Sequence, residues 1–232
     1  MDSATTPIVV LVHGAWADGS SWRRVIPLLL ARGIAVVAVQ NPTTSLADDV
    51  AATRRALAAI DGPVVLVGHS WGGAVITEAG NDPKVKALVY VAAFAPDAGE
   101  TLGALVGAYP PPPALAHIVD DGTGFLKLAE QGWIEDVAPD LPEIEARTLA
   151  ALQPPLAAST FGDTVTRPAW ASRPNWYIVS AQDRVVSVEL ERAFAANMKA
   201  KVTELPAGHL SLLSMPDDVA GVIAEAVEAV AG

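Results

Sequence analysis

The sequence predicts an α/β fold, in which a doubly wound, mostly parallel sheet of about six strands carries helices on both faces. Three observations predict it. Short apolar runs alternate with stretches of helical length through the first hundred residues. These runs are hydrophobic at almost every position, as expected of parallel strands covered on both sides. The same alternation resumes near the C-terminus after a proline-rich interruption. Such alternation is typical of a parallel sheet with right-handed connections.

The first half of the chain supplies four of the predicted strands. They are expected at residues 8–12, 34–39, 64–67 and within 85–94. The segments between them have lengths suited to helices, at residues 22–31, 45–60 and 72–80. The helix at 45–60 has an apolar stripe that would face the sheet, formed by Leu46, Val50, Leu57 and Ile60.

The pattern changes between residues 95 and 174. Four consecutive prolines at 110–113 exclude a helix interior or a central strand there. Short helices are expected at 124–132 and 141–152. The strand pattern then resumes with strands at 176–179 and 201–205 and helices at 188–200 and 216–230. We therefore expect a single domain over residues 1–232, with a small cap insertion at about 95–174.

Composition excludes several classes of function. The chain is 51% hydrophobic, carries a formal net charge of −11 and has only 15 scattered basic residues, which argues against nucleic acid as a partner. No apolar run reaches the roughly 18 residues of a membrane span, so no membrane partner is expected. The absence of cysteine excludes disulfides and a cysteine nucleophile. Residues 1–7 lack the basic start of a signal peptide, and the cytoplasm is the expected location.

One motif carries the chemistry. Residues 68–72 (GHSWG) match the pattern G-x-S-x-G between a predicted strand and a predicted helix. In that setting Ser70 is expected in a strained turn that exposes its hydroxyl, with Gly68 and Gly72 allowing strand and helix to approach closely. The alternative is that Ser70 only caps the helix, a position that serines favour. Ser70 is the predicted nucleophile.

A serine hydroxyl needs a base within hydrogen-bond reach, and the chain has four histidines. His209 follows the last predicted strand, at the sheet edge where α/β folds place their sites. His13 is interpreted as structural at the end of the first strand, and the side chain of His69 is expected to diverge from that of Ser70. His117 lies in the irregular insertion. His209 is therefore the predicted general base.

The acid should precede the histidine in the chain and follow another strand. Asp183 meets both conditions, and a carboxylate there would orient the imidazole and stabilise its charged form. Asp97, just after the fourth strand, is the alternative, although the proline beside it favours a turn or helix cap. The predicted triad therefore has the chain order Ser70, Asp183, His209.

The reaction also needs an oxyanion hole made of two backbone N–H groups. One should come from Trp71, which follows the nucleophile, and the other from the loop after the first strand. Ala15 is the first choice there, and Trp16 the second. Trp16 and Trp71 are expected to line the substrate pocket, whereas Trp22 fits the pocket and the core equally well.

Taken together, these residues resemble the α/β-hydrolase superfamily along almost the whole chain. Three stretches are similar to the group of plant methylesterases and hydroxynitrile lyases: residues 10–16 (VLVHGAW), 67–73 (VGHSWGG) and 91–97 (VAAFAPD). The insertion at 95–174 shows no such likeness. For lyase chemistry, the resemblance implies a threonine at position 14 and a lysine at position 210. This chain has Gly14 and Leu210 instead, which favours esterase over lyase chemistry. Haloalkane dehalogenases and epoxide hydrolases of similar fold use an aspartate nucleophile at this position. Ser70 therefore argues against both activities.

The resulting hypothesis is a serine esterase that cleaves a small, hydrophobic carboxylic ester or lactone through an acyl-enzyme, without metal or organic cofactor. Lyase-type or cofactor-free haloperoxidase-type chemistry on the same triad is kept as an alternative. So is a receptor that binds a small ligand without turnover. A homodimer is compatible with the frequency of symmetric dimers among proteins, although no residue indicates one.

Overall fold

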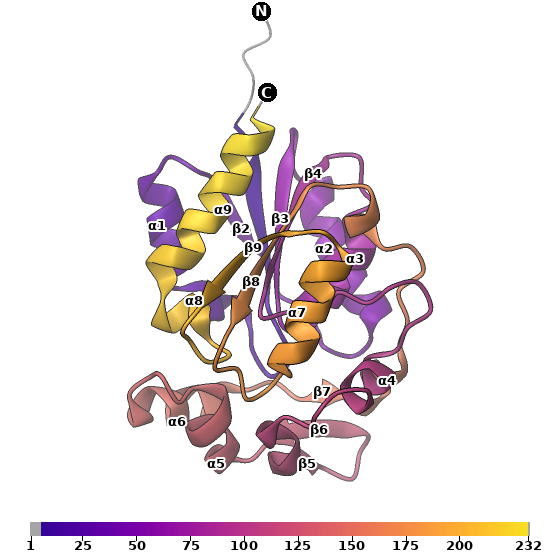
Figure 1. Ribbon diagram of the computed structural model, residues 1–232, viewed down its shortest axis with the longest axis vertical. Coiled ribbons are helices and arrows are strands. Elements are labelled where there is room, and N and C mark those ends of the chain that lie inside the picture. The colour runs from indigo at the N-terminus through magenta and orange to yellow at the C-terminus, as the bar shows by residue number, and fades with distance from the viewer. Residues whose placement is uncertain (1–5, 232) are drawn as a thin grey trace, which may run out of the picture.

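A six-stranded parallel sheet forms the centre of the computed structural model, which describes residues 6–231 (Figure 1). Its strands are β1 (Ile8–Val12), β2 (Val36–Ala38), β3 (Val64–His69), β4 (Val85–Val91), β8 (Asn175–Ser180) and β9 (Lys201–Leu205). They lie in the order β2-β1-β3-β4-β8-β9, and every neighbouring pair is parallel. The order changes direction between β1 and β3, the point where open α/β sheets bind ligands. The predicted doubly wound sheet is confirmed.

Side chains alternate between two cores, one on each face of the sheet. Along β1, Val9 and Leu11 belong to one buried cluster, and Val10 and Val12 belong to the other. This period of two, with apolar residues on both sides, explains why the run reads as continuously hydrophobic.

Helices cover both faces (Figure 1). One face carries α1 (Val25–Ala31), α8 (Ser211–Ser214) and α9 (Pro216–Val230), and the other carries α2 (Leu46–Ala58), α3 (Trp71–Ala79) and α7 (Val188–Asn197). The side-chain oxygen of Ser45 caps α2 by accepting a hydrogen bond from the N–H of Asp48. A short 3-10 helix, η1 (Gly19–Trp22), precedes α1 and takes the start of the helix predicted at 22–31.

Most of the chain between β4 and β8 lies beyond the carboxyl ends of the strands (Figure 1), and we call this part, residues 95–162, the cap. The cap contains a small antiparallel sheet in the order β5-β6-β7. Its elements are α4 (Leu102–Gly107), η2 (Pro113–His117), β5 (Ile118–Asp120), β6 (Phe125–Leu128), α5 (Glu130–Gly132), η3 (Trp133–Val137), α6 (Glu143–Leu152), β7 (Leu156–Ala157) and η4 (Ala158–Gly162). Residues 163–174 return beside α3 to the start of β8. The returning segment contains η5 (Ala169–Ala171), which packs against α3.

Within the cap, one predicted helix is confirmed and one is wrong. The helix predicted at 141–152 is found as α6. The helix predicted at 124–132 is replaced by β6 and the single turn α5. Gly122 and Gly124 have positive φ angles, which suit the turn before β6, and β6 then pairs with β5 and β7.

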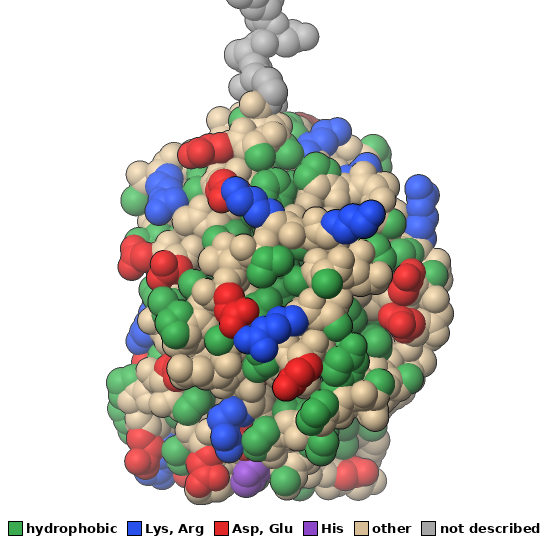
Figure 2. All heavy atoms as spheres, viewed as in Figure 1, with side chains coloured by type: hydrophobic (Ala, Val, Ile, Leu, Met, Phe, Trp, Pro, Cys, Tyr) green, Lys and Arg blue, Asp and Glu red, His purple; other side chains and the backbone are tan. Residues whose placement is uncertain are grey.

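Charged side chains are interspersed with hydrophobic ones on the face shown in Figure 2. Within residues 6–231, none of the helices is both long and apolar enough to cross a membrane. The expectation about the N-terminus rests largely on residues 1–5, which lie outside the described part of the chain.

Candidate active site

Ser70 occupies a strained turn between β3 and α3. Its φ of 52° and ψ of −123° lie in a region that residues with a side chain rarely adopt. The turn is held by main-chain hydrogen bonds, because the N–H of Ser70 donates to Val91 and its carbonyl accepts from Gly73 and Phe94. The strained conformation expected of this serine is therefore found, and no side-chain cap from Ser70 to the helix accompanies it.

Close packing around this turn requires glycine. A Cβ built on Gly68 would lie 2.6 Å from the carbonyl oxygen of Gly72, and one on Gly72 would lie 2.5 Å from that of Val12. Both distances are shorter than side chains tolerate, so β1, β3 and α3 can meet here only without these side chains.

His209 and Asp183 come together from loops at the ends of neighbouring strands. The Nδ1 of His209 lies 2.6 Å from Oδ2 of Asp183, and both side chains are almost completely buried. The other carboxylate oxygen accepts hydrogen bonds from the N–H groups of Val185 and Val186, at 2.7 and 2.9 Å. A carboxylate fixed in this way directs the Nδ1 proton towards itself and leaves Nε2 free for a second partner.

Ser70 and His209 line the same small cavity, together with Ala15, Trp16 and His69. Among the described residues, the hydrogen bonds do not include one between the Ser70 hydroxyl and Nε2 of His209. Catalytic hydrogen bonds are often long in the absence of substrate and tighten when it binds. The shared cavity is thus the observation that brings Ser70 and His209 together.

Asp97, the alternative acid, is exposed, and its carboxylate accepts a hydrogen bond from the N–H of Ala98. It stabilises a local turn, as the neighbouring proline indicates. Among the described residues, it is Asp183 that holds the His209 imidazole.

His13, another buried histidine, makes two hydrogen bonds to the backbone. The Nδ1–H of His13 donates to the Gly14 carbonyl, and its Nε2 accepts from the N–H of Asn41. Burial lowers the pKa of His13, and this pattern of one donor and one acceptor requires the neutral ring. The structural interpretation of His13 is consistent with these contacts.

Two further buried groups lie close to the His209–Asp183 pair: His69, whose contact with the His209 backbone was not expected, and Glu191, which the sequence did not single out. The Nε2–H of His69 donates to the backbone carbonyl of His209 at 3.0 Å, and His69 lines the small cavity together with Ser70. Burial, followed by the nearby His209, lowers the pKa of His69 well below its usual value. Glu191 of α7 is completely buried and accepts a hydrogen bond from the N–H of Ser180. Burial and the charge of Asp183 raise the pKa of Glu191 well above its usual value.

Backbone N–H groups near Ser70 are available for an oxyanion. Those of Ala15 and Trp71 have no hydrogen-bond partner within the described chain, and both residues line a cavity with Ser70. Trp71 begins α3, so its N–H also lies at the positive end of the helix. Its indole N–H donates to Asp49, which fixes the ring.

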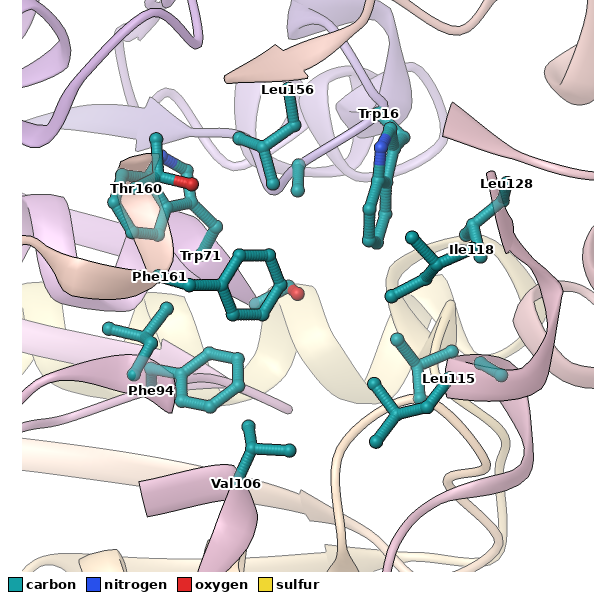
Figure 3. Close-up of a pocket in the computed structure, with 15 residues that line it drawn as sticks. Trp16, Trp71, Phe94, Val106, Leu115, Ile118, Leu128, Leu156, Thr160 and Phe161 are labelled. Atoms are coloured by element: carbon teal, nitrogen blue, oxygen red, sulfur yellow. The ribbon is translucent and has the colours of Figure 1, made fainter. Parts of the chain in front are cut away.

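The larger cavity beside Ser70 is almost wholly apolar (Figure 3). The rings of Phe94 and Phe161 lie on one side, opposite Trp16, Leu115 and Ile118 (Figure 3). Apart from Ser70, the only hydroxyl in the lining belongs to Thr160, and it donates to the Ala157 carbonyl. Trp16 and Trp71 line the cavity as expected. Trp22 is fully buried against His69 and belongs to the core.

The described residues contain no group of three His, Cys, Asp or Glu side chains that could hold a metal ion. The arrangement instead offers a strained serine, a carboxylate-bound histidine, free backbone N–H groups and an apolar cavity.

Comparison with known proteins identifies the family of the chain. Residues 9–222 match the model of the alpha/beta hydrolase family. The chain is 25% identical to the carbendazim hydrolyzing esterase of a Nocardioides species, over 93% of this chain and 97% of that protein. It is 27% identical to methylesterase 7 of Arabidopsis thaliana, over 97% and 98%. The crystal structure of a pyrethroid hydrolase from Sphingobium faniae superposes with a TM-score of 0.82 at 25% identity, covering 98% of this chain and 99% of that one.

Proposed function

The chain belongs to the alpha/beta hydrolase family, and we propose that it is a serine esterase that cleaves uncharged, hydrophobic carboxylic esters or lactones. The proposal treats residues 1–232 as one domain, with Ser70 as nucleophile, His209 as general base and Asp183 as the orienting acid. The observation that carries it is that Ser70 and His209 line one cavity while Asp183 binds the other nitrogen of the imidazole.

In the proposed reaction, Nε2 of His209 accepts the Ser70 proton as the hydroxyl oxygen attacks the ester carbonyl carbon. The carbonyl oxygen becomes an oxyanion, which the N–H groups of Ala15 and Trp71 stabilise. His209 then gives its proton to the leaving alkoxide, and the acyl group remains on Ser70. A water molecule, deprotonated by His209, releases the carboxylic acid and regenerates the serine.

The apolar lining supports the choice of substrate. None of the 15 residues around the larger cavity has a charged side chain, and both indole N–H groups in the lining are already engaged, that of Trp16 by the Leu126 carbonyl. A charged acyl or alcohol group would lose its hydration there without gaining a partner. Relatives named for pyrethroid and carbendazim hydrolysis are in keeping with this preference.

Position 14 supports hydrolysis over lyase chemistry. A Cβ on Gly14 would lie 2.8 Å from Cβ of Ser70 and 3.1 Å from Nδ1 of His69. The threonine that the lyase resemblance implies has no room at this position unless the turn moves.

The test is hydrolysis of p-nitrophenyl acetate by the wild type and Ser70→Ala. Removing the nucleophile should lower kcat by several orders of magnitude. The matched control is Ser172→Ala, a serine near the start of β8, at the opposite end of that strand from the site, and it should leave kcat unchanged. Equal slow hydrolysis by the wild type and Ser70→Ala would overturn the proposal and favour lyase or receptor function.

A further inference from the structure

Two carboxylates of the cap contact the two loops that carry Asp183 and His209. We propose that Asp136 and Asp140 are positioning residues, which hold the acid and the base in catalytic geometry from the cap side. This inference rests on the proposed function, because it concerns the same triad.

The first contact holds the acid loop. The Nε of Arg184, the residue after Asp183, donates to Oδ1 of Asp136 at 2.8 Å. Asp136 is only 1% exposed whereas the Arg184 side chain is 48% exposed, so this ion pair is shielded from water on the carboxylate side only. The carbonyl of Arg184 also accepts a hydrogen bond from the cap, from the N–H of Ala114 at 3.0 Å. The acid loop is thus fixed to the cap through both side chain and main chain.

The second contact holds the histidine loop. The N–H of Gly208, the residue before His209, donates to Oδ2 of Asp140 at 2.5 Å. A Cβ on Gly208 would lie 3.1 Å from the same oxygen and 3.3 Å from Pro139, so cap and loop are in close contact. A charge-assisted hydrogen bond of this kind stabilises one position of the loop.

Both carboxylates belong to one short segment, four residues apart. The same segment contributes Trp133 and Val137 to the cavity that contains Ser70 and His209. One segment of the cap, residues 133–140, therefore lines a cavity with Ser70 and contacts both the acid loop and the histidine loop. Because a displacement of about 1 Å can cost a hundredfold in rate, losing either contact is expected to slow the chemical step more than substrate binding. Neither Asp136 nor Asp140 lines the larger cavity.

The experiment compares Asp136→Ala and Asp140→Ala with Glu143→Ala. Glu143 lies in the same cap at the start of α6 and is exposed. Its side chain has no hydrogen bond or ion pair among the described residues. With p-nitrophenyl acetate, each aspartate variant should lower kcat about tenfold and leave KM within about twofold, by the positioning argument above. Asp140→Asn keeps an acceptor oxygen for Gly208 and should recover most of kcat. The control should match the wild type.

A second readout is independent of turnover. The proton shared by His209 Nδ1 and Asp183 gives a far-downfield proton NMR signal, which should broaden in Asp140→Ala and remain in Glu143→Ala. If Asp140→Ala fails to fold, Gly208→Ala presses a methyl group against the same carboxylate and should lower kcat similarly.

Three outcomes separate the possibilities. If both aspartate variants keep the wild-type kcat and the NMR signal, the positioning role is overturned. A rise in KM at unchanged kcat overturns it too, because it assigns the segment to substrate binding. If the wild type shows no Ser70-dependent turnover, the proposed function fails, and the NMR comparison still decides whether the cap orients His209.

Discussion

At the scale of single residues, Asp49 connects the nucleophile turn to the cap. Its buried carboxylate accepts hydrogen bonds from the indole N–H of Trp71, at 2.7 Å, and from the N–H of Thr43, at 2.8 Å. The carbonyl of Thr43 in turn accepts from the N–H of Ala157 in β7. Asp49 therefore supports the residue whose N–H is assigned to the oxyanion.

Burial raises the pKa of Asp49 from 3.8 to about 6, against the opposing effect of the two hydrogen bonds. The folded protein thus binds this proton more tightly than the unfolded chain does. The contribution of Asp49 to the free energy of unfolding falls as pH rises from about 4 to about 6, by up to about 3 kcal/mol, and is constant above that range.

Asp49→Asn should remove this pH dependence, because the amide does not titrate. Loss of one acceptor oxygen destabilises the variant by an amount that does not change with pH. The free energy of unfolding of the variant should therefore rise relative to that of the wild type as pH increases from 4 to 7. Urea unfolding at several pH values measures it. A difference that stays constant with pH would contradict the prediction.

At the scale of elements, the sheet and its helices could be predicted because local pattern decides them. Parallel strands buried on both faces are uniformly apolar, and the G-x-S-x-G turn marks the junction of β3 and α3 in the sequence. The meeting of the loops at one sheet edge follows from the parallel arrangement of the strands, whose carboxyl ends all lie at that edge. The residues proposed for catalysis could be chosen on that basis.

The cap could not be predicted in the same way. The pairing of Phe125 with Ala157 joins residues more than thirty positions apart, and no local periodicity specifies it. Residues 124–132 instead form β6 and the single turn α5, a conformation that depends on the pairing of β6 with β5 and β7. For the same reason the contacts of Asp136 and Asp140 were not found, since each depends on a cap conformation that its own neighbours do not determine.

The two helices α3 and α9 offer a matched pair of glycines for testing the close packing of the nucleophile turn. A Cβ on Gly72 would lie 2.5 Å from a backbone oxygen of β1, whereas one on Gly221 in α9 would meet nothing within 4 Å. Gly72→Ala should destabilise the protein by about 2 kcal/mol or more, within the range for overpacked positions. Gly221→Ala should stabilise it by about 0.5–1 kcal/mol through helix propensity.

Urea unfolding of the two variants checks this prediction, and the Gly221 variant should retain full esterase activity. If Gly72→Ala is as stable as the wild type, the close approach of β1 and α3 is not a constraint on this turn.

At the scale of the whole molecule, two features disfavour a negatively charged substrate. The protein carries a formal net charge of −11, which repels an anionic ester before it binds. The cavity beside Ser70 has no charged side chain in its lining, so an anion that enters it loses its hydration without compensation. The first effect acts through solvent and is screened by salt, whereas the second acts inside the cavity.

Comparing p-nitrophenyl hexanoate with the mono-p-nitrophenyl ester of adipic acid separates these effects, because the acids have the same chain length and differ in a terminal carboxylate, which lies too far from the ester to form a cyclic anhydride readily. We expect kcat/KM to be about a hundredfold lower for the anion, since an unpaired charge costs several kcal/mol to bury. Raising ionic strength from 10 to 150 mM shortens the screening length from about 30 to about 8 Å. This increase in ionic strength should raise kcat/KM for the anionic ester by only about threefold. The methyl ester of the adipate compound is the control, and it should react like the hexanoate. Full recovery of the anion's rate in salt would contradict the assignment of an apolar substrate to this cavity, because it would leave long-range repulsion as the only source of selectivity.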